Sequence, residues 1–313
     1  MIQEKAKQLI KDAVEKNVQD IYIVPKKEHY EIYQRVGDER QFIQEVASDE
    51  MTSVISHFKF VAGMNVGEKR RSQLGSCDYE FAEGEEISLR LSTVGDYRGR
   101  ESLVIRLLYS DRHDLQYWFD GMKNILEAID SRGLYLFSGP VGSGKTTLMY
   151  QLIREKFPDK QVITIEDPVE IKQDNMLQLQ LNDEIGMTYD NLIKLSLRHR
   201  PDILIIGEIR DSETARAVIR ASLTGVLVFS TIHAKSIPGV YARLLELGVS
   251  RQELENSLRA IIYQRLIGGG GVVDFAKGDF EHYPPTRWNE QIKSLARDGH
   301  IGLEEAKIEK IAL

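Results

Sequence analysis

Residues 134–149 read LYLFSGPVGSGKTTLM, and this stretch decides the fold. Its first four residues form a short apolar run that is typical of a buried strand, and Leu148-Met149 begin an apolar helix. Between them stands Gly-x-x-x-x-Gly-Lys-Thr, the pattern of a phosphate-binding loop. Strand, glycine-rich loop and helix therefore follow one another in the order that this motif requires.

The loop has the chemistry to hold a nucleoside triphosphate. Glycine permits a positive φ and a close backbone approach, so N–H groups can wrap a phosphate at the helix N-terminus. Lys145 supplies positive charge to the β- and γ-phosphates, and the Thr146 hydroxyl is a ligand for Mg²⁺. A glycine-rich turn without a ligand is the alternative, which the matching context disfavours. We predict a site for ATP and Mg²⁺ formed by Gly139, Pro140, Val141, Gly142, Ser143, Gly144, Lys145, Thr146 and Thr147.

Three further apolar runs follow, at 162–165, 203–206 and 226–229, with helical patterns between them. Such runs indicate an α/β domain with a buried, mostly parallel sheet, which we place at residues 121–313. The run Gly268–Gly271 is expected to end a helix and open a flexible segment. Residues 289–311 are expected to be helical, with Trp288, Ile292 and Leu295 packing one face.

The first third of the chain mixes helical and alternating patterns. Residues 2–16 and 50–62 have helical spacing, whereas 21–24, 30–33, 87–92 and 102–108 suggest strands. We expect a small α+β domain over residues 1–108, followed by a polar and aromatic linker at 109–120 that serves as a hinge.

Composition narrows the function classes. The 313 residues suit two domains, and the net charge of -7 argues against a broad nucleic-acid coat. Cys77 is the single cysteine, which excludes an internal disulfide and a four-thiolate zinc site; inert packing is expected for it. The start lacks the apolar core of a signal peptide, and no stretch is long enough to span a bilayer, so we expect a cytoplasmic protein.

Acidic residues and a histidine follow three of the strands, at the edge where ligands of open α/β sheets gather. Glu166 and Asp167 precede Pro168 and could instead cap a turn. Glu208 ends an apolar strand, where a carboxylate needs a cation, so a functional role is favoured. Asp211 is better explained as a helix N-cap. His233 follows Ser230-Thr231-Ile232, and its position favours a functional over a structural role.

These segments resemble a known family. The loop 139–146, the acidic segment 163–170, Gly207-Glu208-Ile209-Arg210-Asp211 and the segment 230–233 match the Walker A, Asp box, Walker B and His box of the secretion ATPases. That family powers type II secretion and type IV pili, and the likeness covers roughly residues 10–265. Within it, the length and segments such as 70–75 and 197–202 look closest to the competence-pilus ATPases of Gram-positive bacteria, streptococci included.

The resemblance implies a RecA-like P-loop ATPase domain after a PAS-like N-terminal domain. It also implies roles: Glu170 matches the catalytic glutamate that acts on water, Glu208 the Walker B glutamate that acts on Mg²⁺ and water, and His233 a γ-phosphate sensor. Family members work as hexamers, with arginines of the N-terminal domain reaching the nucleotide. Arg90, Arg98 and Arg106 look similar in position, although surface arginines on strands are common.

Three departures from the family pattern stand out. Val226 follows Thr224-Gly225 where many members have a histidine, so we expect no two-histidine mechanism. The tetracysteine zinc module of many assembly ATPases is not possible, so no structural zinc is expected. The additional N-terminal docking domain of larger relatives is expected to be missing, which leaves the contact with the membrane partner open.

The favoured function is a homo-hexameric motor that hydrolyses Mg-ATP to assemble a competence pilus for DNA uptake. Its expected partner is an integral-membrane platform protein, which places it at the inner face of the cell membrane. The alternatives are a retraction or type II secretion ATPase, a nucleotide-binding scaffold, and a nucleic-acid motor. The last would use the basic clusters 69–71 and 194–200, which more often pair with carboxylates, so stable nucleic-acid binding is not expected.

Overall fold

The computed structural model describes residues 2–36, 39–109, 114–182 and 185–311, which divide into two compact units at Asp111/Arg112. Within these described ranges, every helix is too short or too polar to cross a bilayer. Each unit has its own sheet and its own apolar core. We describe the units one at a time.

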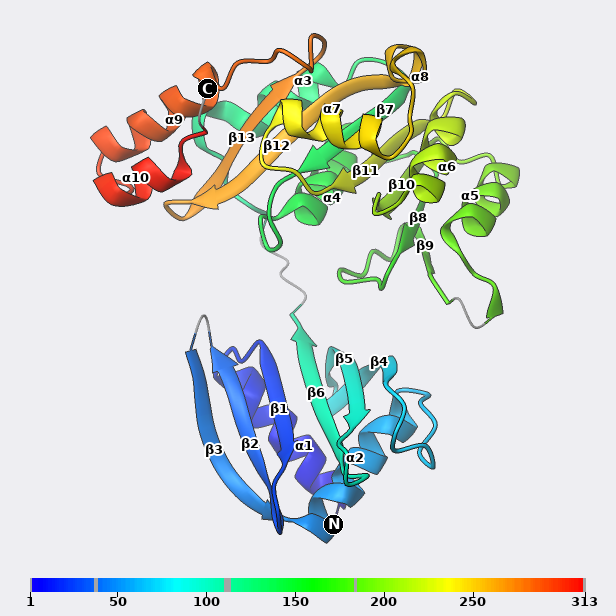
Figure 1. Ribbon diagram of the computed structural model, residues 1–313, viewed down its shortest axis with the longest axis vertical. Helices are drawn as coiled ribbons and strands as arrows, with labels where there is room; N and C mark the ends of the chain where they lie inside the picture. The colour runs from blue at the N-terminus through cyan, green and yellow to red at the C-terminus, as the bar shows by residue number, and fades with distance from the viewer. Residues whose placement is uncertain (1, 37–38, 110–113, 183–184, 312–313) are drawn as a thin grey trace. The chain divides into compact units, whose positions relative to one another are not determined.

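The N-terminal unit is a six-stranded antiparallel sheet with two helices on one face (Figure 1). The strand order is β3-β2-β1-β6-β5-β4. Apolar side chains alternate along the central strands and pack against the helices, as in a sheet with one covered face. The elements are α1 (Ile2–Glu15), β1 (Asp20–Pro25), β2 (His29–Val36), β3 (Glu39–Ala47), α2 (Ser48–Val61), β4 (Gln73–Ala82), β5 (Glu85–Gly95) and β6 (Glu101–Leu108).

Two strands of this sheet do not follow from the sequence pattern. β3 is an edge strand whose side chains are mostly exposed and polar, so it lacks the apolar alternation that marks a half-buried strand. β4 is the other edge strand, and its residues are mostly exposed or only partly buried. Cys77 lies on β4, and burial raises the pKa of its thiol to about 11, which agrees with inert packing.

A buried ion pair lies inside the N-terminal unit. Lys59 of α2 is fully buried, and its Nζ lies 2.6 Å from Glu101 Oε1 at the start of β6. The same ammonium donates to the Glu68 carbonyl at 2.5 Å. Lys59 therefore ties the helix both to the sheet and to the loop before β4.

The second unit is a seven-stranded sheet in the order β13-β12-β7-β11-β10-β8-β9. All neighbours run parallel except the β12–β13 pair. The strands are β7 (Gly133–Ser138), β8 (Val162–Glu166), β9 (Leu177–Gln180), β10 (Ile203–Glu208), β11 (Leu227–Ile232), β12 (Leu258–Ile267) and β13 (Gly270–Ala276). A mostly parallel sheet is therefore confirmed, and the four predicted strands lie at its centre.

Helices cover both faces of this sheet, which explains why its strands are continuously apolar. Tyr135 and Phe137 of β7 pack with α3 and α4, whereas Leu134 and Leu136 pack on the opposite face. The helices are α3 (Gly121–Ala128), α4 (Lys145–Lys156), α5 (Tyr189–Arg198), α6 (Ser212–Ser222), α7 (Ile237–Glu246), α8 (Arg251–Ser257), α9 (Thr286–Arg297) and α10 (Leu303–Glu309). On α9, Trp288, Ile292 and Leu295 are buried, as predicted.

The prediction for Gly268–Gly271 was wrong. The run forms the tight turn of the β12–β13 hairpin, in which Ile267 pairs with Gly270. Gly268 and Gly269 have φ of 58° and 80°, so the two-residue turn uses the left-handed backbone that glycine allows. The segment before it is strand β12 and not the expected helix, which the pattern does not reveal because a short run of apolar residues occurs in strands and in helices alike.

Residues of the predicted linker on either side of the undescribed segment belong to one unit or the other. Tyr109 belongs to the N-terminal unit, where its hydroxyl donates to the Val18 carbonyl at 2.8 Å. Tyr117 and Trp118 pack on the second unit, so closely that a Cβ on Gly271 or Gly270 would collide with them. The Gly271 N–H also bonds to the Gln116 carbonyl at 2.8 Å. Of the predicted hinge, residues 110–113 lie outside the described residues.

Candidate nucleotide site

The phosphate loop connects β7 to α4 at the carboxyl end of the parallel sheet. Gly139 has a φ of 143°, and a Cβ placed there would lie 2.1 Å from the Gln264 carbonyl of β12. Gly142 and Gly144 have φ of 75° and 80°, in the region that favours glycine. The loop conformation therefore depends on all three glycines, and Gly139 is required by contact as well as by φ.

Lys145 begins α4 and folds back over the loop. Its Nζ donates to the carbonyls of Pro140 at 2.8 Å and Gly139 at 3.1 Å. Burial lowers the pKa of Lys145, and the charges of Glu208 and Glu170 act in the opposite direction. The ammonium is thus held at the loop by groups that a phosphate can replace.

Glu208 ends β10 beside the loop. Its Oε2 accepts from Arg210 Nε at 2.5 Å, and its Oε1 lies 3.1 Å from His233 Nε2. The other ring nitrogen, His233 Nδ1, lies 3.1 Å from the Gly139 carbonyl. Glu208 and His233 therefore lie side by side at the loop, as expected for groups at neighbouring strand ends.

Hydrogen bonds between β10 and β11 fix this arrangement. Glu208 is in register with Thr231, whose Oγ1 donates to the Gly207 carbonyl at 2.6 Å. Ser230 Oγ donates to the Ile206 carbonyl at 2.7 Å. The two hydroxyls before His233 thus bind the end of β10 and hold Glu208 and His233 in one register.

The acidic residues at the end of β8 and after it, Glu166 and Glu170, have different environments. Glu166 is only 5% exposed and accepts bonds from Thr164 Oγ1 at 2.6 Å, Tyr150 OH at 2.7 Å and Gln178 Nε2 at 3.2 Å. Burial raises the pKa of Glu166, and those bonds lower it. This carboxyl therefore joins β8, β9 and α4. Glu170, by contrast, is exposed, and its charge reaches Lys145.

Arg210 is a member of the site to which sequence reasoning gave no role. Besides Glu208, it contacts Asp167 Oδ2 through Nη1 at 3.1 Å, so it joins the ends of β8 and β10. The nearby Glu208 carboxylate raises its pKa, chiefly through the hydrogen bond. The available signal in the sequence was the position of Arg210, a cation two residues after the strand-end carboxylate Glu208. Asp211 next to it is the N-cap of α6, accepting from Thr214 N at 2.8 Å, which confirms that prediction.

The predicted arginines all belong to the N-terminal unit. Arg90 on β5 and Arg106 on β6 are cross-strand partners, and Arg98 lies in the turn between these strands. Arg106 Nε donates to Asp20 Oδ1 at 2.7 Å, and the Arg98 guanidinium lies 4.9 Å from the centre of the Tyr97 ring. The nucleotide site described above is built from the second unit alone. A role of these arginines at the nucleotide remains a prediction.

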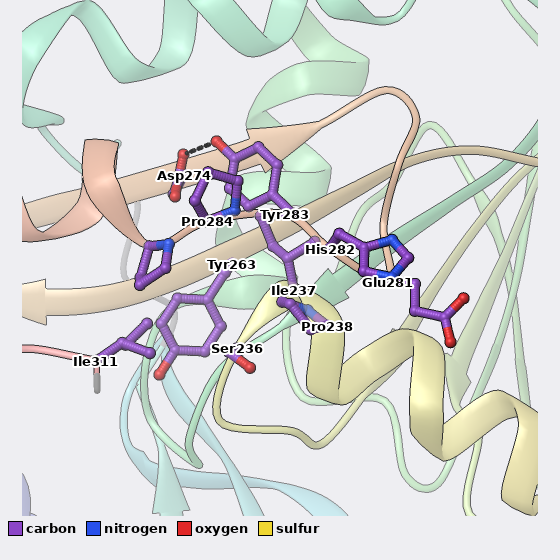
Figure 2. A pocket seen from close by; sticks show the side chains of 11 residues that line it. Ser236, Ile237, Pro238, Tyr263, Asp274, Glu281, His282, Tyr283, Pro284 and Ile311 are labelled. Atoms are coloured by element: carbon purple, nitrogen blue, oxygen red, sulfur yellow. Dashed lines mark hydrogen bonds between the residues drawn. The ribbon is translucent and has the colours of Figure 1, made fainter. Parts of the chain in front are cut away.

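Two other features bear on ligand binding. A cavity of about 390 Å³ is lined by both apolar and polar side chains, among them Ile237 and Tyr263. Figure 2 shows these side chains. The buried carboxylate among them, Asp274, accepts from Tyr283 OH at 2.8 Å, and the cavity includes none of the predicted site residues. On the N-terminal sheet, ligand atoms of His29, Glu31 and Glu45 lie within 4.8 Å of one another. Lys26 and Tyr33 already bind Glu31, so we assign no metal there.

Comparison with known proteins places the chain among secretion proteins. The family model described as "Type II/IV secretion system protein" matches residues 1–273. Competence protein ComGA of Streptococcus pneumoniae is 64% identical over 312 residues, which cover 100% of this chain and 99% of the relative. ComGA of Bacillus subtilis is 38% identical over 274 residues, covering 85% of this chain and 76% of the relative.

The fold also has counterparts among solved structures. The pilus retraction motor PilT, solved with bound ADP, has a TM-score of 0.78 at 22% identity, with 98% of this chain and 97% of that chain covered. At this identity the likeness shows the fold. It agrees with an α/β domain that follows a smaller N-terminal domain.

Proposed function

The chain belongs to the type II/IV secretion system protein family, and from this membership we propose that it is an ATPase that drives assembly of a competence pilus for DNA uptake. One observation supports the ATPase most directly. The phosphate loop, Glu208 and His233 come from three neighbouring strands and meet at one sheet edge. The competence assignment is supported by the full-length relative that is named for it.

Each site residue has a role in this proposal. Lys145 exchanges its two loop carbonyls for the β- and γ-phosphates. Glu170 is exposed, its charge acts on Lys145, and it accepts the proton of the attacking water. His233 contacts both Glu208 and the loop, which suits a group that responds to the γ-phosphate.

Magnesium and ATP suit the residues present. Thr146, in the first turn of α4, and Glu208 are oxygen donors beside the loop, the ligand type that Mg²⁺ prefers. When bound, Mg²⁺ neutralises charge that develops on the phosphates. The positive φ of Gly142 and Gly144 suits a loop whose backbone N–H groups wrap a phosphate.

The proposal extends to the assembly. A homo-hexamer would bring Arg90, Arg98 and Arg106 of one subunit to the nucleotide of the next, where guanidinium groups stabilise the transferring phosphoryl. The ring would work at the inner face of the membrane on an integral platform protein. The basic clusters 69–71 and 194–200 partly pair with acids: Lys194 with Asp190 at 2.5 Å, and Arg71 with Glu68 at 3.9 Å. Pairing of this kind favours protein contacts over stable nucleic-acid binding, which a salt-dependent assay with duplex DNA tests.

Two variants test the site. Lys145→Ala and Glu208→Gln are each expected to reduce ATP turnover by about 10²-fold or more, because each removes a charge that acts on the transition state. Glu213→Gln, an exposed acid on α6, is the matched control. Phosphate release by the purified assembly is the measurement, and normal turnover in both variants would refute the assignment. Gene deletion, scored for transformation, twitching and secretion, separates pilus assembly from retraction and type II secretion.

A further inference from the structure

Gln264 lies beneath the phosphate loop with an unpaired side chain. It belongs to β12, is 1% exposed, and is in contact with both end glycines of the loop. Its backbone carbonyl oxygen would lie 2.1 Å from a Cβ built on Gly139, and its side-chain Nε2 would lie 3.0 Å from a Cβ built on Gly144. Over the described part of the chain, neither amide atom has a hydrogen-bond partner. Buried amides are nearly always bonded, so this one requires an explanation.

Ser143 presents a second unpaired group in the same place. Its side chain is 3% exposed, and its Oγ has no partner within the described ranges. That oxygen lies 2.8 Å from the position of a Cβ on Gly139. An unpaired hydroxyl therefore lies beside the first glycine of the loop, Gly139, and an unpaired amide beside Gly144.

Other polar groups nearby are already bonded. Tyr117 OH donates to Gln151 Oε1 at 3.0 Å, and Gln151 Nε2 donates to the Leu115 carbonyl at 3.2 Å. Burial raises the pKa of Tyr117, and the nearby Gln264 side chain lowers it, although the amide and the hydroxyl do not have the geometry of a hydrogen bond. Gln264 thus lies in a polar layer between the loop and residues 115–117, and its amide is the unpaired part of that layer.

Movement of Lys145 supplies the missing partners. Its Nζ now donates to the carbonyls of Gly139 and Pro140. A bound polyphosphate takes the ammonium away and leaves these carbonyls without that donor. Each carbonyl keeps one other contact, Gly139 with His233 Nδ1 at 3.1 Å and Pro140 with the Ser143 N–H at 3.3 Å, and each can accept a second donor. The Gln264 amide and the Ser143 hydroxyl are buried donors without a partner that lie against the loop.

We propose that Gln264 is a positioning residue for the nucleotide: its amide, together with Ser143 Oγ, bonds to the phosphate loop only when the loop holds a polyphosphate. The two side chains replace Lys145 as donors to the loop backbone. They thereby favour the loop that holds a polyphosphate over the loop in which Lys145 bonds to the carbonyls of Gly139 and Pro140. This inference rests on the proposed nucleotide site and adds two residues that distinguish the loop with a bound polyphosphate from the loop without one.

The test replaces the amide with an apolar group of similar size. Gln264→Met is expected to melt at a temperature equal to or above that of the wild type without nucleotide, because it removes unpaired buried atoms. Its Kd for MgADP is expected to rise about 5-fold, the usual effect of losing one hydrogen bond. Ser143→Ala should show the same pair of effects. Thermal unfolding and titration with fluorescent MgADP give the two readings on the full chain.

A matched control comes from α9. Gln291 is 8% exposed, and its Oε1 is also unpaired among the residues described. Gln291→Met should share the effect on melting and leave the Kd for MgADP unchanged. This separates nucleotide positioning from a general gain through removal of a buried amide.

Each result decides the matter. An unchanged Kd in Gln264→Met and Ser143→Ala overturns the positioning role. A lower melting temperature of Gln264→Met without nucleotide, with an unchanged Kd, shows instead that the amide has a structural partner. If Gln264→Met does not fold, Ser143→Ala alone carries the decision. If the folded wild type does not bind MgADP, the nucleotide site itself is refuted, which the wild-type titration reveals before any variant is compared.

Discussion

His233 joins Glu208 to the first glycine of the phosphate loop: its Nε2 lies 3.1 Å from Glu208 Oε1 and its Nδ1 3.1 Å from the Gly139 carbonyl. Both partners are acceptors, and a neutral imidazole can donate to one of them only. The ring therefore connects the carboxylate that we propose to act on metal and water to the loop that we propose to hold the phosphates. A γ-phosphate arriving at the loop changes the surroundings of both contacts.

We expect His233→Ala to reduce ATP turnover by about 10²-fold, the usual effect of removing one donor aimed at developing charge. The Kd for MgADP should change by less than about 3-fold, because ADP lacks the phosphate that the ring responds to. Turnover and nucleotide titration are the measurements. His282→Ala, at an exposed histidine, is the control. An equal loss of ADP affinity and turnover would contradict the sensor role.

The arginines of the N-terminal unit should separate into two kinds. Arg106 binds Asp20, which is nearly buried, so Arg106→Ala should lower the free energy of unfolding by about 1–3 kcal/mol. Arg98 contacts the exposed Tyr97 ring, so Arg98→Ala should change stability by less than about 0.5 kcal/mol. Turnover of the Arg98→Ala assembly should nevertheless fall by roughly 10³-fold if Arg98 reaches a neighbouring nucleotide.

Urea unfolding and phosphate release measure the two effects separately. Unchanged stability in Arg106→Ala would show that its bond to Asp20 is not structural. Normal turnover in Arg98→Ala would remove Arg98 from the catalytic set.

The pKa of Glu166 predicts a pH effect on stability. Burial raises its pKa in the folded protein, so between the unfolded and the folded pKa the folded state binds more protons. The contribution of this carboxyl to stability is fully present below the unfolded pKa, near 4.5, and is lost as pH rises through the folded pKa. Wild type should therefore lose stability relative to Glu166→Gln as pH rises from 4.5.

Urea unfolding of both proteins at several pH values gives this difference, in which the other titrating groups cancel. A difference that is constant with pH, or one that favours wild type more at higher pH, would contradict the assigned direction.

The buried pair Lys59–Glu101 should stabilise the N-terminal unit only as a pair. Lys59→Met leaves the Glu101 carboxylate buried without its cation, which costs about 3–5 kcal/mol. Adding Glu101→Leu should recover much of this loss, since an apolar pair of similar volume can replace a buried ion pair. Urea unfolding measures both.

The exposed pair Lys5–Glu50 provides the control, and Lys5→Met should cost less than about 1 kcal/mol. If Lys59→Met were equally mild, the pair would not be structurally important.

Much of the second unit follows from local sequence. Strands β7, β8, β10 and β11 are central and buried on both faces, so each leaves a continuous apolar run. β12 is equally central but contains Gln264 and Arg265, which interrupt the pattern. β9 and β3 lie at sheet edges, where exposure removes the apolar signal.

The site was predictable as a set of residues but less so as a geometry. The order of strand ends predicts that Glu208 and His233 share one edge. Their contact depends on the register of β10 against β11, which is set by hydroxyl bonds between distant residues. Gln264 acquires its importance only through such long-range neighbours, so no local pattern reveals it, whereas Arg210 also has a local partner in Glu208.

β7 lies between β12 and β11 and is hydrogen-bonded to both. The strand that leads into the phosphate loop is thus fixed on both sides, because sliding it would break its hydrogen bonds to two neighbouring strands at once. In the motor that we propose, mechanical work must originate elsewhere. The strand that carries the loop then serves as the fixed reference against which the groups at the carboxyl edge of the sheet move.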